Sequence, residues 1–516
     1  MITLRLRHIL LFTFTLLLTA CQFEDDSDCP KDENIAASYI NLTIAVSNGN
    51  THNRTRAGEM PTAGEDGDGR EAGFERENAV TGITLILYQS DANGINTGTD
   101  LTLDLVRYFP VTKVGNSATQ GTSYEAGSAH GKHADQIEAK YTTGPQLIGK
   151  YGLTRIDFSK TYHAIVIANY DMTGTLKEDG TSKLSNVRDV ALSTIYSGDY
   201  TKAANLYTNF IMSSEEDNTL NFAANGVMTE DVSGDKTYNF DDDSHALVIE
   251  RMAARIDFWF KGATYDDSYP TPGYVYQPWK TNDINTPTSD DRFVITSITP
   301  FNLKSGTEYL LKRTNDEAKY LASETGINYV IDPVTSTKTS IPSSDNYGYV
   351  NSLLSIASLS NFSTNDYCHT IASMHGLSSA SSTIDGKDNV VVCYPMENAL
   401  PDNSPLYYYA TGIAIEGDYY IGNNKTDATK KEHRIYFGYI RHQGESETAY
   451  DALLPSELST ETKTSNNNPM NFGIVRNNIY RISIDKVHEK TDEKPKITLK
   501  IKVKKWDKFE HAPIYM

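Results

Sequence analysis

The chain has 516 residues, a formal net charge of −20 and 33 tyrosines. A chain of this length exceeds what one hydrophobic core organises and predicts two domains. The negative charge argues against binding to the phosphate backbone of nucleic acids. The chain is also rich in Tyr, Thr, Ser, Asn and Gly, a composition typical of half-buried strands joined by polar turns.

Residues 1–20 have the pattern of a lipoprotein signal peptide. A short basic start precedes an apolar run at residues 9–18, which is too short to span a bilayer comfortably. The small residue Ala20 then stands directly before Cys21. This order predicts signal cleavage between Ala20 and Cys21, lipid attachment to Cys21, and export to the outer membrane, where acyl chains would anchor the precursor.

Residues 21–56 are predicted to be a propeptide that contains a removable strand. Within residues 40–46 the apolar and polar side chains alternate, and a polar, exposed-looking segment follows. A protease that cut between Arg56 and Ala57, with Arg54 as the competing site, would remove the lipid and the strand together. The groove left behind could be filled by another chain. The apolar residues of this displaced strand are Ile40, Leu42, Ile44 and Val46.

The remaining chain is expected to form an N-terminal domain at residues 57–255 and a C-terminal domain at residues 256–516. Many strands, few helices and turn residues between them favour an all-β fold of antiparallel sandwiches. One short helix is expected at residues 184–195. Strands are expected at residues 83–88, 101–108, 163–169, 246–260, 293–298, 390–394, 407–415, 434–440 and 479–487.

The segment at residues 496–516 carries the sharpest strand pattern of the chain. Its apolar residues lie on one face, and lysines dominate the other. Residues 488–495 before it are charged and end in proline, so the strand could hang free on a tether and complete an open sheet in another subunit. An ordinary terminal strand of its own domain is the alternative. The candidate donor residues are Ile497, Leu499, Ile501 and Val503.

Two cysteines, Cys368 and Cys393, remain once the propeptide is removed. They could close a disulfide loop of about 25 residues, or remain two reduced, buried thiols. The sequence contains no zinc-protease signature, nucleophile elbow or phosphate-binding loop, so neither an enzyme activity nor a metal or cofactor is predicted. Tyrosines at residues 407–409 and 419–420 leave open a surface glycan-binding lipoprotein that stacks sugars on aromatic rings.

Several segments resemble one known family. These are residues 474–480 before the last two strands, residues 248–255, more weakly residues 394–398, and the Arg56-Ala57-Gly58 sequence near the start. In this order they resemble the fimbrillins of the Bacteroidales type V pilus, most closely the shaft subunit of the short (minor) fimbriae. The intervening loops match poorly.

The resemblance implies two tandem β-sandwich domains of transthyretin-like Greek-key topology and cleavage at Arg56 by an Arg-specific surface protease. It further implies strand exchange with other copies and with anchor and tip subunits, giving extracellular fimbriae for adhesion. Asp28-Cys29-Pro30 is similar to the anchor subunits of the family, so an anchor or an accessory or tip subunit stays open. The sequence does not identify a receptor on a host or bacterial surface.

Overall fold

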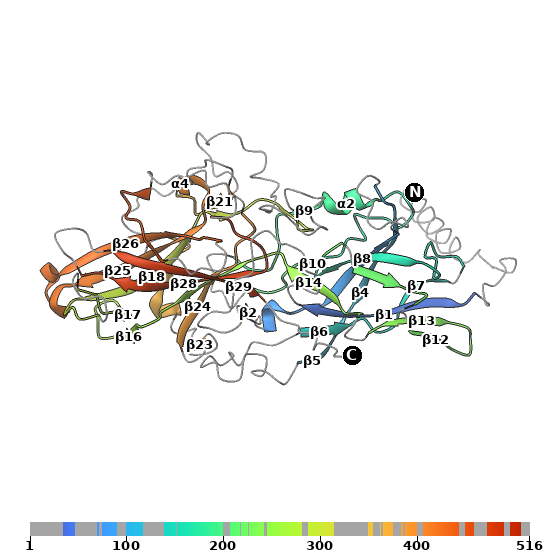
Figure 1. Cartoon of the computed structure of the whole chain (residues 1–516), viewed down its shortest axis with the longest axis horizontal. Coiled ribbons are helices and arrows are strands. Elements are labelled where there is room, and N and C mark those ends of the chain that lie inside the picture. Colours follow the sequence, from blue (N-terminus) through green and yellow to red (C-terminus); the bar gives the residue numbers. More distant parts are fainter. Residues whose placement is uncertain are drawn as a thin grey trace, which may run out of the picture.

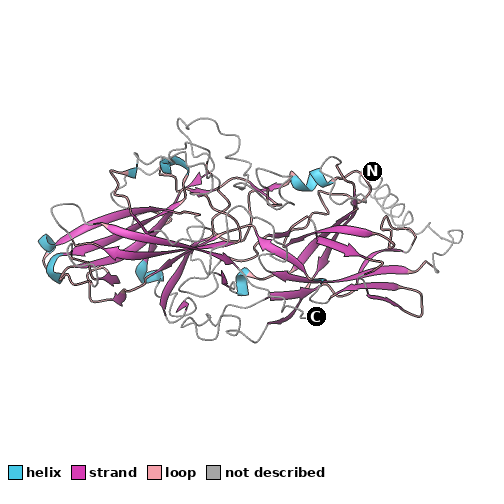
Figure 2. Ribbon diagram, in the orientation of Figure 1, coloured by secondary structure: helices cyan, strands magenta, loops and turns pink. Residues whose placement is uncertain are grey.

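The structure is a computed structural model, and strands dominate it (Figures 1 and 2). Within the described part, no helix combines the length and the apolar character needed to cross a bilayer. The described residues are 35–46, 70–71, 75–89, 100–116, 139–150, 152–199, 207–216, 218–224, 227–241, 245–280, 287–313, 349–353, 362, 365–374, 383–384, 387–398, 400, 406–442, 449–458, 472–489 and 496–506.

The elements of the N-terminal half run from β1 to β14. In chain order they are β1 (Ala37–Val46), β2 (Arg70–Glu71), η1 (Glu75–Glu77), β3 (Gly82–Tyr88), β4 (Leu103–Pro110), β5 (Thr112–Asn116), β6 (Ala139–Thr142), β7 (Gln146–Lys150), β8 (Thr161–Ala168), α2 (Leu184–Arg188), β9 (Ala191–Leu192), β10 (Met212–Ser214), β11 (Asn218–Asn221), β12 (Val227–Glu230), β13 (Lys236–Phe240) and β14 (Leu247–Arg251).

The C-terminal half contains the remaining elements. They are β15 (Arg255–Trp259), β16 (Thr264–Asp266), β17 (Gly273–Tyr276), β18 (Arg292–Phe301), β19 (Leu303–Lys304), β20 (Glu308–Tyr309), β21 (Tyr349–Val350), β22 (His369–Thr370), β23 (Thr383–Ile384), β24 (Lys387–Cys393), α4 (Leu406–Tyr409), β25 (Gly412–Tyr420), η5 (Ile421–Asn423), η6 (Ala428–Lys430), β26 (Lys431–Tyr439), β27 (Ala449–Asp451), β28 (Asn478–Val487) and β29 (Ile497–Trp506).

The N-terminal half is built on a 12-stranded sheet whose main path is β12-β13-β1-β14-β10-β8-β3-β4. Its central strands β3 and β8 are almost wholly buried, because their sequences are continuous runs of aliphatic residues. The C-terminal half contributes most strands of a 7-stranded sheet, whose path β2-β29-β28-β15-β24-β23 begins with β2 from the N-terminal half, and all of a 6-stranded sheet with the path β16-β17-β18-β25-β26. The all-β architecture expected from the sequence is therefore confirmed.

Most strand pairs are antiparallel, but the first strand of each half pairs in parallel with a late strand of the same half. β1 is parallel to β13 and β14, and β15 is parallel to β28. The expectation of purely antiparallel sheets was wrong at these strands. The pairings bring chain segments about 200 residues apart into one ladder, as in the register from Ser38 opposite Lys236 to Leu42 opposite Phe240. Beside this ladder, the Ala37 amide donates to the Asp235 carboxylate at 2.8 Å.

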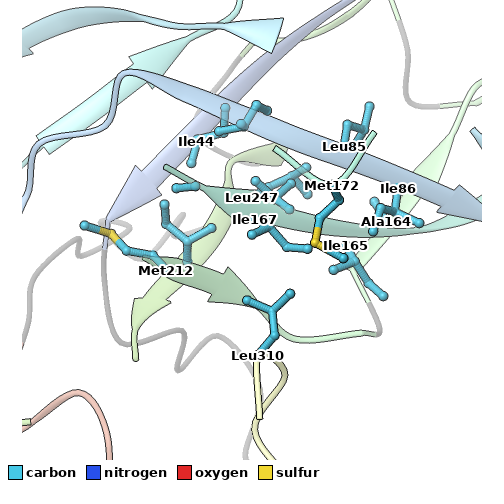
Figure 3. Packing of buried hydrophobic residues seen from close by; sticks show 14 of the residues in the cluster. Ile44, Leu85, Ile86, Ala164, Ile165, Ile167, Met172, Met212, Leu247 and Leu310 are labelled. Atoms are coloured by element: carbon cyan, nitrogen blue, oxygen red, sulfur yellow. The ribbon is translucent and has the colours of Figure 1, made fainter. Parts of the chain in front are cut away.

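Each half has its own hydrophobic core, and the chain passes from one core to the other between Ala253 and Ala254. Figure 3 shows the first core, where Ile44 of β1 and Leu247 of β14 lie among residues of β3 and β8. Leu310, from the C-terminal half, also enters this core, and its carbonyl accepts a bond from the Ser213 hydroxyl at 2.9 Å. The two halves are thus packed together (Figure 1).

Three sequence expectations differ from the structure. The helix ends at Arg188 instead of residue 195, because Ala191–Leu192 pairs with β20 as β9. The strand expected at residues 246–260 is divided into β14 and β15, with the change of core between them. Residues 406–409 form helix α4, and the strand predicted there begins only at Gly412. In each case tertiary pairing overrides the local pattern.

Candidate functional site

β1 is an interior strand with neighbours along both edges. One edge pairs with β13 over residues 38–42 and with β14 over residues 44–46. The other edge pairs with β7 over residues 37–40 and with β6 over residues 43–46. Along the main path of the sheet, β1 is the strand that joins β13 to β14. Its removal would open a groove with unpaired backbone groups on both sides.

The partners of β1 change at Leu42 and Thr43, and Thr143 holds the strand at this point. The Leu42 amide donates to the Thr143 hydroxyl at 3.0 Å. In return, the Thr143 amide donates to the Leu42 carbonyl at 3.0 Å. Thr143 lies between β6 and β7, so these bonds continue the ladder where neither strand does. The backbone of β1 is therefore bonded without a break on this side.

The apolar face of β1 is fully inserted in the N-terminal core. Burying four such side chains stabilises the domain by roughly 6–12 kcal/mol before ordering costs are subtracted. A chain that lost β1 would expose this core unless another strand replaced it. The four side chains are Ile40, Leu42 and Ile44, each 0% exposed, and Val46, 2% exposed.

The opposite face of β1 is polar at its start and buried at its end. The Asn41 amide donates to the Asp241 carboxylate at 2.9 Å, and the Thr43 hydroxyl donates to the Asp241 carbonyl at 2.8 Å. Thr43 is 2% exposed, and Ala45 is 0% exposed. The second half of β1 is consequently covered on both faces, which alternation alone does not reveal.

β29 pairs with its own domain in this structure. It runs antiparallel to β28 from the pair Val487 and Ile497 to the pair Asn478 and Lys505. Its side chains Ile497, Leu499 and Ile501 are buried in the C-terminal core. The sequence suggested that this strand could hang free. In this structure it does not, because its apolar side chains pack in the core of its own domain. Val503 pairs with Tyr480 in the backbone register.

The C-terminal domain is shaped to receive β29. A Cβ atom added to Gly438 of β26 would lie 2.5 Å from Leu499 Cδ1, so a larger residue there would require the leucine side chain to shift. On the outer face of β29, Lys500 Nζ lies 3.0 Å from Asp485 Oδ1, and both side chains are partly exposed. The outer edge pairs with β27 near Leu499 and with β2 near Trp506. The outer face of β29 is thus partly exposed at Lys500, whereas that of β1 is buried at Thr43 and Ala45.

The predicted processing sites lie outside the described residues. This applies to the signal cleavage and lipidation positions Ala20 and Cys21, and to the protease sites Arg54, Arg56 and Ala57. The structure describes β1, which lies between the lipidation and protease positions, and the segment after the protease sites from Arg70 onward. Glu77, 21 residues after Arg56, is 0% exposed and lies 3.2 Å from Arg255 of β15. The chain beyond the cleavage site is therefore anchored at the junction of the two halves.

Cys368 and Cys393 are both free thiols in this structure. Cys393, at the end of β24, is 0% exposed in the C-terminal core, and Cys368 is partly exposed. Burial raises the pKa of both thiols above its ordinary value. Of the two thiols, only Cys393 has the full burial that the alternative of two reduced, buried thiols expects.

The tyrosines considered for sugar stacking are mostly inside the protein. Tyr409 is 3% exposed, Tyr419 is 0% exposed and Tyr420 is 1% exposed. Tyr419 donates its hydroxyl to the Asp291 carboxylate at 2.6 Å. Rings enclosed in this way do not present a face to a ligand, and the expectation of a stacking platform was wrong for these three. Within the described residues, no group of three or more His, Cys, Asp or Glu side chains is placed to hold a metal ion.

Sequence patterns did not reveal a buried ionic group at the junction of the two halves. Arg476 Nη2 lies 3.1 Å from Glu308 Oε1 and 2.8 Å from Glu397 Oε2, and each side chain is 1% exposed. Arg476 also donates to the carbonyls of Tyr309 and Leu310. Burial raises the pKa of Glu308 to about 8; Arg476 opposes this rise and Glu397 adds to it. The sequence signal that could have indicated this group is the presence of the charged residues Glu397 and Arg476 within sequence that is otherwise typical of strands.

No family model matches the chain, and neither does any curated protein. Among solved structures, the chain is similar to the tip fimbrial protein Mfa3 of Porphyromonas gingivalis with a C-terminal truncation, at 9% identity and a TM-score of 0.39, over 91% of this chain and 99% of that one. A proposed cell adhesion protein of Parabacteroides distasonis has 13% identity and a TM-score of 0.40, over 92% and 100%. The fimbrilin FimA of P. gingivalis has 11% identity and a TM-score of 0.33, over 87% and 90%. With TM-scores below 0.5, these similarities assign neither a family nor a function.

Proposed function

We propose that this protein is a structural subunit of surface fimbriae, exported as a lipoprotein and activated by removal of its first strand. The observation that carries the proposal is the position of β1. It is an interior strand paired along both edges, and it precedes the basic segment that contains Arg54 and Arg56. A single cut after Arg56 would release the lipid anchor and open the groove.

The remainder of the chain is suited to survive that cut. Glu77 and the segment around it are bonded to the junction independently of β1, through Arg255 and the Arg251 guanidinium, which donates to the Glu77 carbonyl at 3.0 Å. The core face of the opened groove would still require a strand with apolar residues at alternate positions. A strand from a neighbouring subunit meets this demand, since addition to a sheet edge supplies both backbone bonds and buried side chains. The result is a fibre that supports adhesion.

N-terminal sequencing of protein taken from intact cells tests this proposal. The expected N-terminus is Ala57, and Arg56→Ala should retain β1 and the lipid on Cys21, whereas the matched variant Arg54→Ala should mature normally. If wild-type protein keeps acylated Cys21, the activation step is wrong and the chain is a permanently anchored subunit.

A terminal subunit that accepts a strand without donating one is a second candidate, and the packing of β29 favours it. A donor would have to withdraw Ile497, Leu499 and Ile501 from the core they occupy. Deletion of β29 would expose that core, so deletion is a poor test. A disulfide between Ser483 and Lys500, which are directly opposed in the β28–β29 register, is sharper.

The variant Ser483→Cys with Lys500→Cys locks β29 to β28 when oxidised. A shaft subunit that donates β29 should then stop assembling fibres and resume after reduction. A terminal subunit should be incorporated equally in both states. Single variants Ser483→Cys and Lys500→Cys control for the substitutions themselves. The two candidate functions therefore predict opposite results in one experiment.

A further inference from the structure

The groove that β1 occupies restricts the side chains on both faces of a strand that enters it. On the core face it requires aliphatic residues at the positions of Ile40, Leu42, Ile44 and Val46. On the other face, Thr43 and Ala45 are 2% and 0% exposed. A long or charged side chain at these two positions would have to displace the surrounding residues or lose its contact with water.

β29 of this chain carries the opposite outer face. Its sequence places lysines at residues 496, 500, 502, 504 and 505. In its own domain Lys500 is partly exposed and lies 3.0 Å from Asp485, so its ammonium group keeps contact with water and with a carboxylate. The strand is suited to a sheet that is buried on one face only.

Superimposing the two patterns gives a direct conflict. If Ile497 takes the position of Ile40, then Lys500 takes that of Thr43 and Lys502 that of Ala45. A shift by two residues toward the end of β1 places Lys500 at Ala45. A shift by two in the opposite direction places Lys502 at Thr43 and Lys504 at Ala45. Each register that keeps the apolar residues inward therefore buries at least one lysine.

We propose that this groove rejects β29 of a second copy and selects the terminal strand of a different subunit, one with small uncharged side chains at the positions of Thr43 and Ala45. This inference rests on the proposed function, since it presumes that the groove is opened. Its consequence is that the chain does not form a homopolymer through β29. It is joined to a fibre by a strand of another sequence.

Peptide exchange tests the inference on the full chain after cleavage behind Arg56. Three peptides compete for the groove: residues 36–47, residues 496–506, and residues 496–506 with Lys500→Thr and Lys502→Ala. A fourth peptide, with Lys504→Thr and Lys505→Ala, removes the same charge but keeps Lys500 and Lys502. Release of the resident leader fragment is followed by mass spectrometry, with uncleaved chain as the control.

The peptide of residues 36–47 should displace the resident fragment, and the unmodified β29 peptide should be roughly tenfold to hundredfold weaker. The Lys500→Thr and Lys502→Ala peptide should recover most of the difference, and the Lys504→Thr and Lys505→Ala peptide should not. Equal displacement by the unmodified β29 peptide would overturn the selection, as would a failure of Lys500→Thr and Lys502→Ala to improve binding. If no peptide acts, not even residues 36–47, the groove itself is absent and the proposed function fails.

Discussion

Leu42 and Thr143 are bonded to each other twice, amide to hydroxyl and amide to carbonyl, each at 3.0 Å. This reciprocal pair lies where β1 leaves β7 for β6 on one edge and β13 for β14 on the other. It holds the middle of a strand that is continuous although its neighbours are not. The Thr143 hydroxyl therefore adds one buried hydrogen bond to the pairing that holds β1 in the uncleaved chain.

Thr143→Val should loosen β1, because the buried Leu42 amide would lose its acceptor at a cost of about 1–3 kcal/mol. Thr143→Ser keeps the oxygen and should behave nearly as wild type. Hydrogen exchange of the peptide spanning residues 37–46 measures the effect, with faster exchange expected for the valine variant alone. Equal protection in both variants would show that the hydroxyl contributes nothing.

Gly438→Ala should destabilise the C-terminal domain by about 1 kcal/mol, since the new Cβ would lie 2.5 Å from Leu499 Cδ1 and the buried leucine side chain would have to shift. Shortening the leucine should relieve the clash. In a double-mutant cycle, Gly438→Ala with Leu499→Ala is expected to lose less stability than the sum of the single variants. Chemical denaturation measures all three, and strict additivity would contradict the close fit of these residues.

Stability should decrease as pH rises through the window set by Glu308. Its ordinary pKa is 4.5, and burial beside Glu397 raises it to about 8 in the folded chain. Between these values the unfolded chain has released the proton while the folded chain still binds it, so rising pH favours unfolding. Below pH 4.5 the contribution is fully present, and it is lost as pH passes through about 8.

Glu308→Gln removes this titration and should flatten the stability curve between pH 5 and 8, by an amount on the order of a few kcal/mol. Lys304, Arg476 and Glu397 face the same group and stay unchanged in the variant. Asp267→Asn, at an exposed position, is the matched control and should keep the wild-type slope. An unchanged slope in Glu308→Gln would mean that Glu308 stays ionised in the folded chain.

Cys368 and Cys393 should differ in their reactivity toward a thiol reagent. In a Cys21→Ser and Cys29→Ser background, native protein should react with a thiol reagent slowly and only at Cys368, because Cys393 is 0% exposed. Two thiols should react in denaturant without a reductant. Absence of reactive thiols under those conditions would instead indicate a disulfide between Cys368 and Cys393.

Much of the fold could be predicted from continuous aliphatic runs such as β3 and β8, because a run of this kind has few alternatives to a buried strand. The end of the helix at Arg188 could not be predicted, because Leu192 of the following strand β9 pairs with Glu308, more than 100 residues away. The buried triad of Glu308, Glu397 and Arg476 escaped prediction for the same reason. Charged residues that are distant in sequence interact only when the fold brings them together.

The sequence by itself determined that β1 and β29 each alternate apolar and polar residues, because a strand turns successive side chains to opposite faces whatever surrounds it. It also placed Arg56 ten residues after Val46, the end of the first of them. Only the tertiary structure decided that the two strands differ on their second face, where Thr43 and Ala45 are covered and Lys500 is not. The burial of a side chain depends on neighbours from distant segments of the chain, and the alternation of apolar and polar residues carries no information about those neighbours.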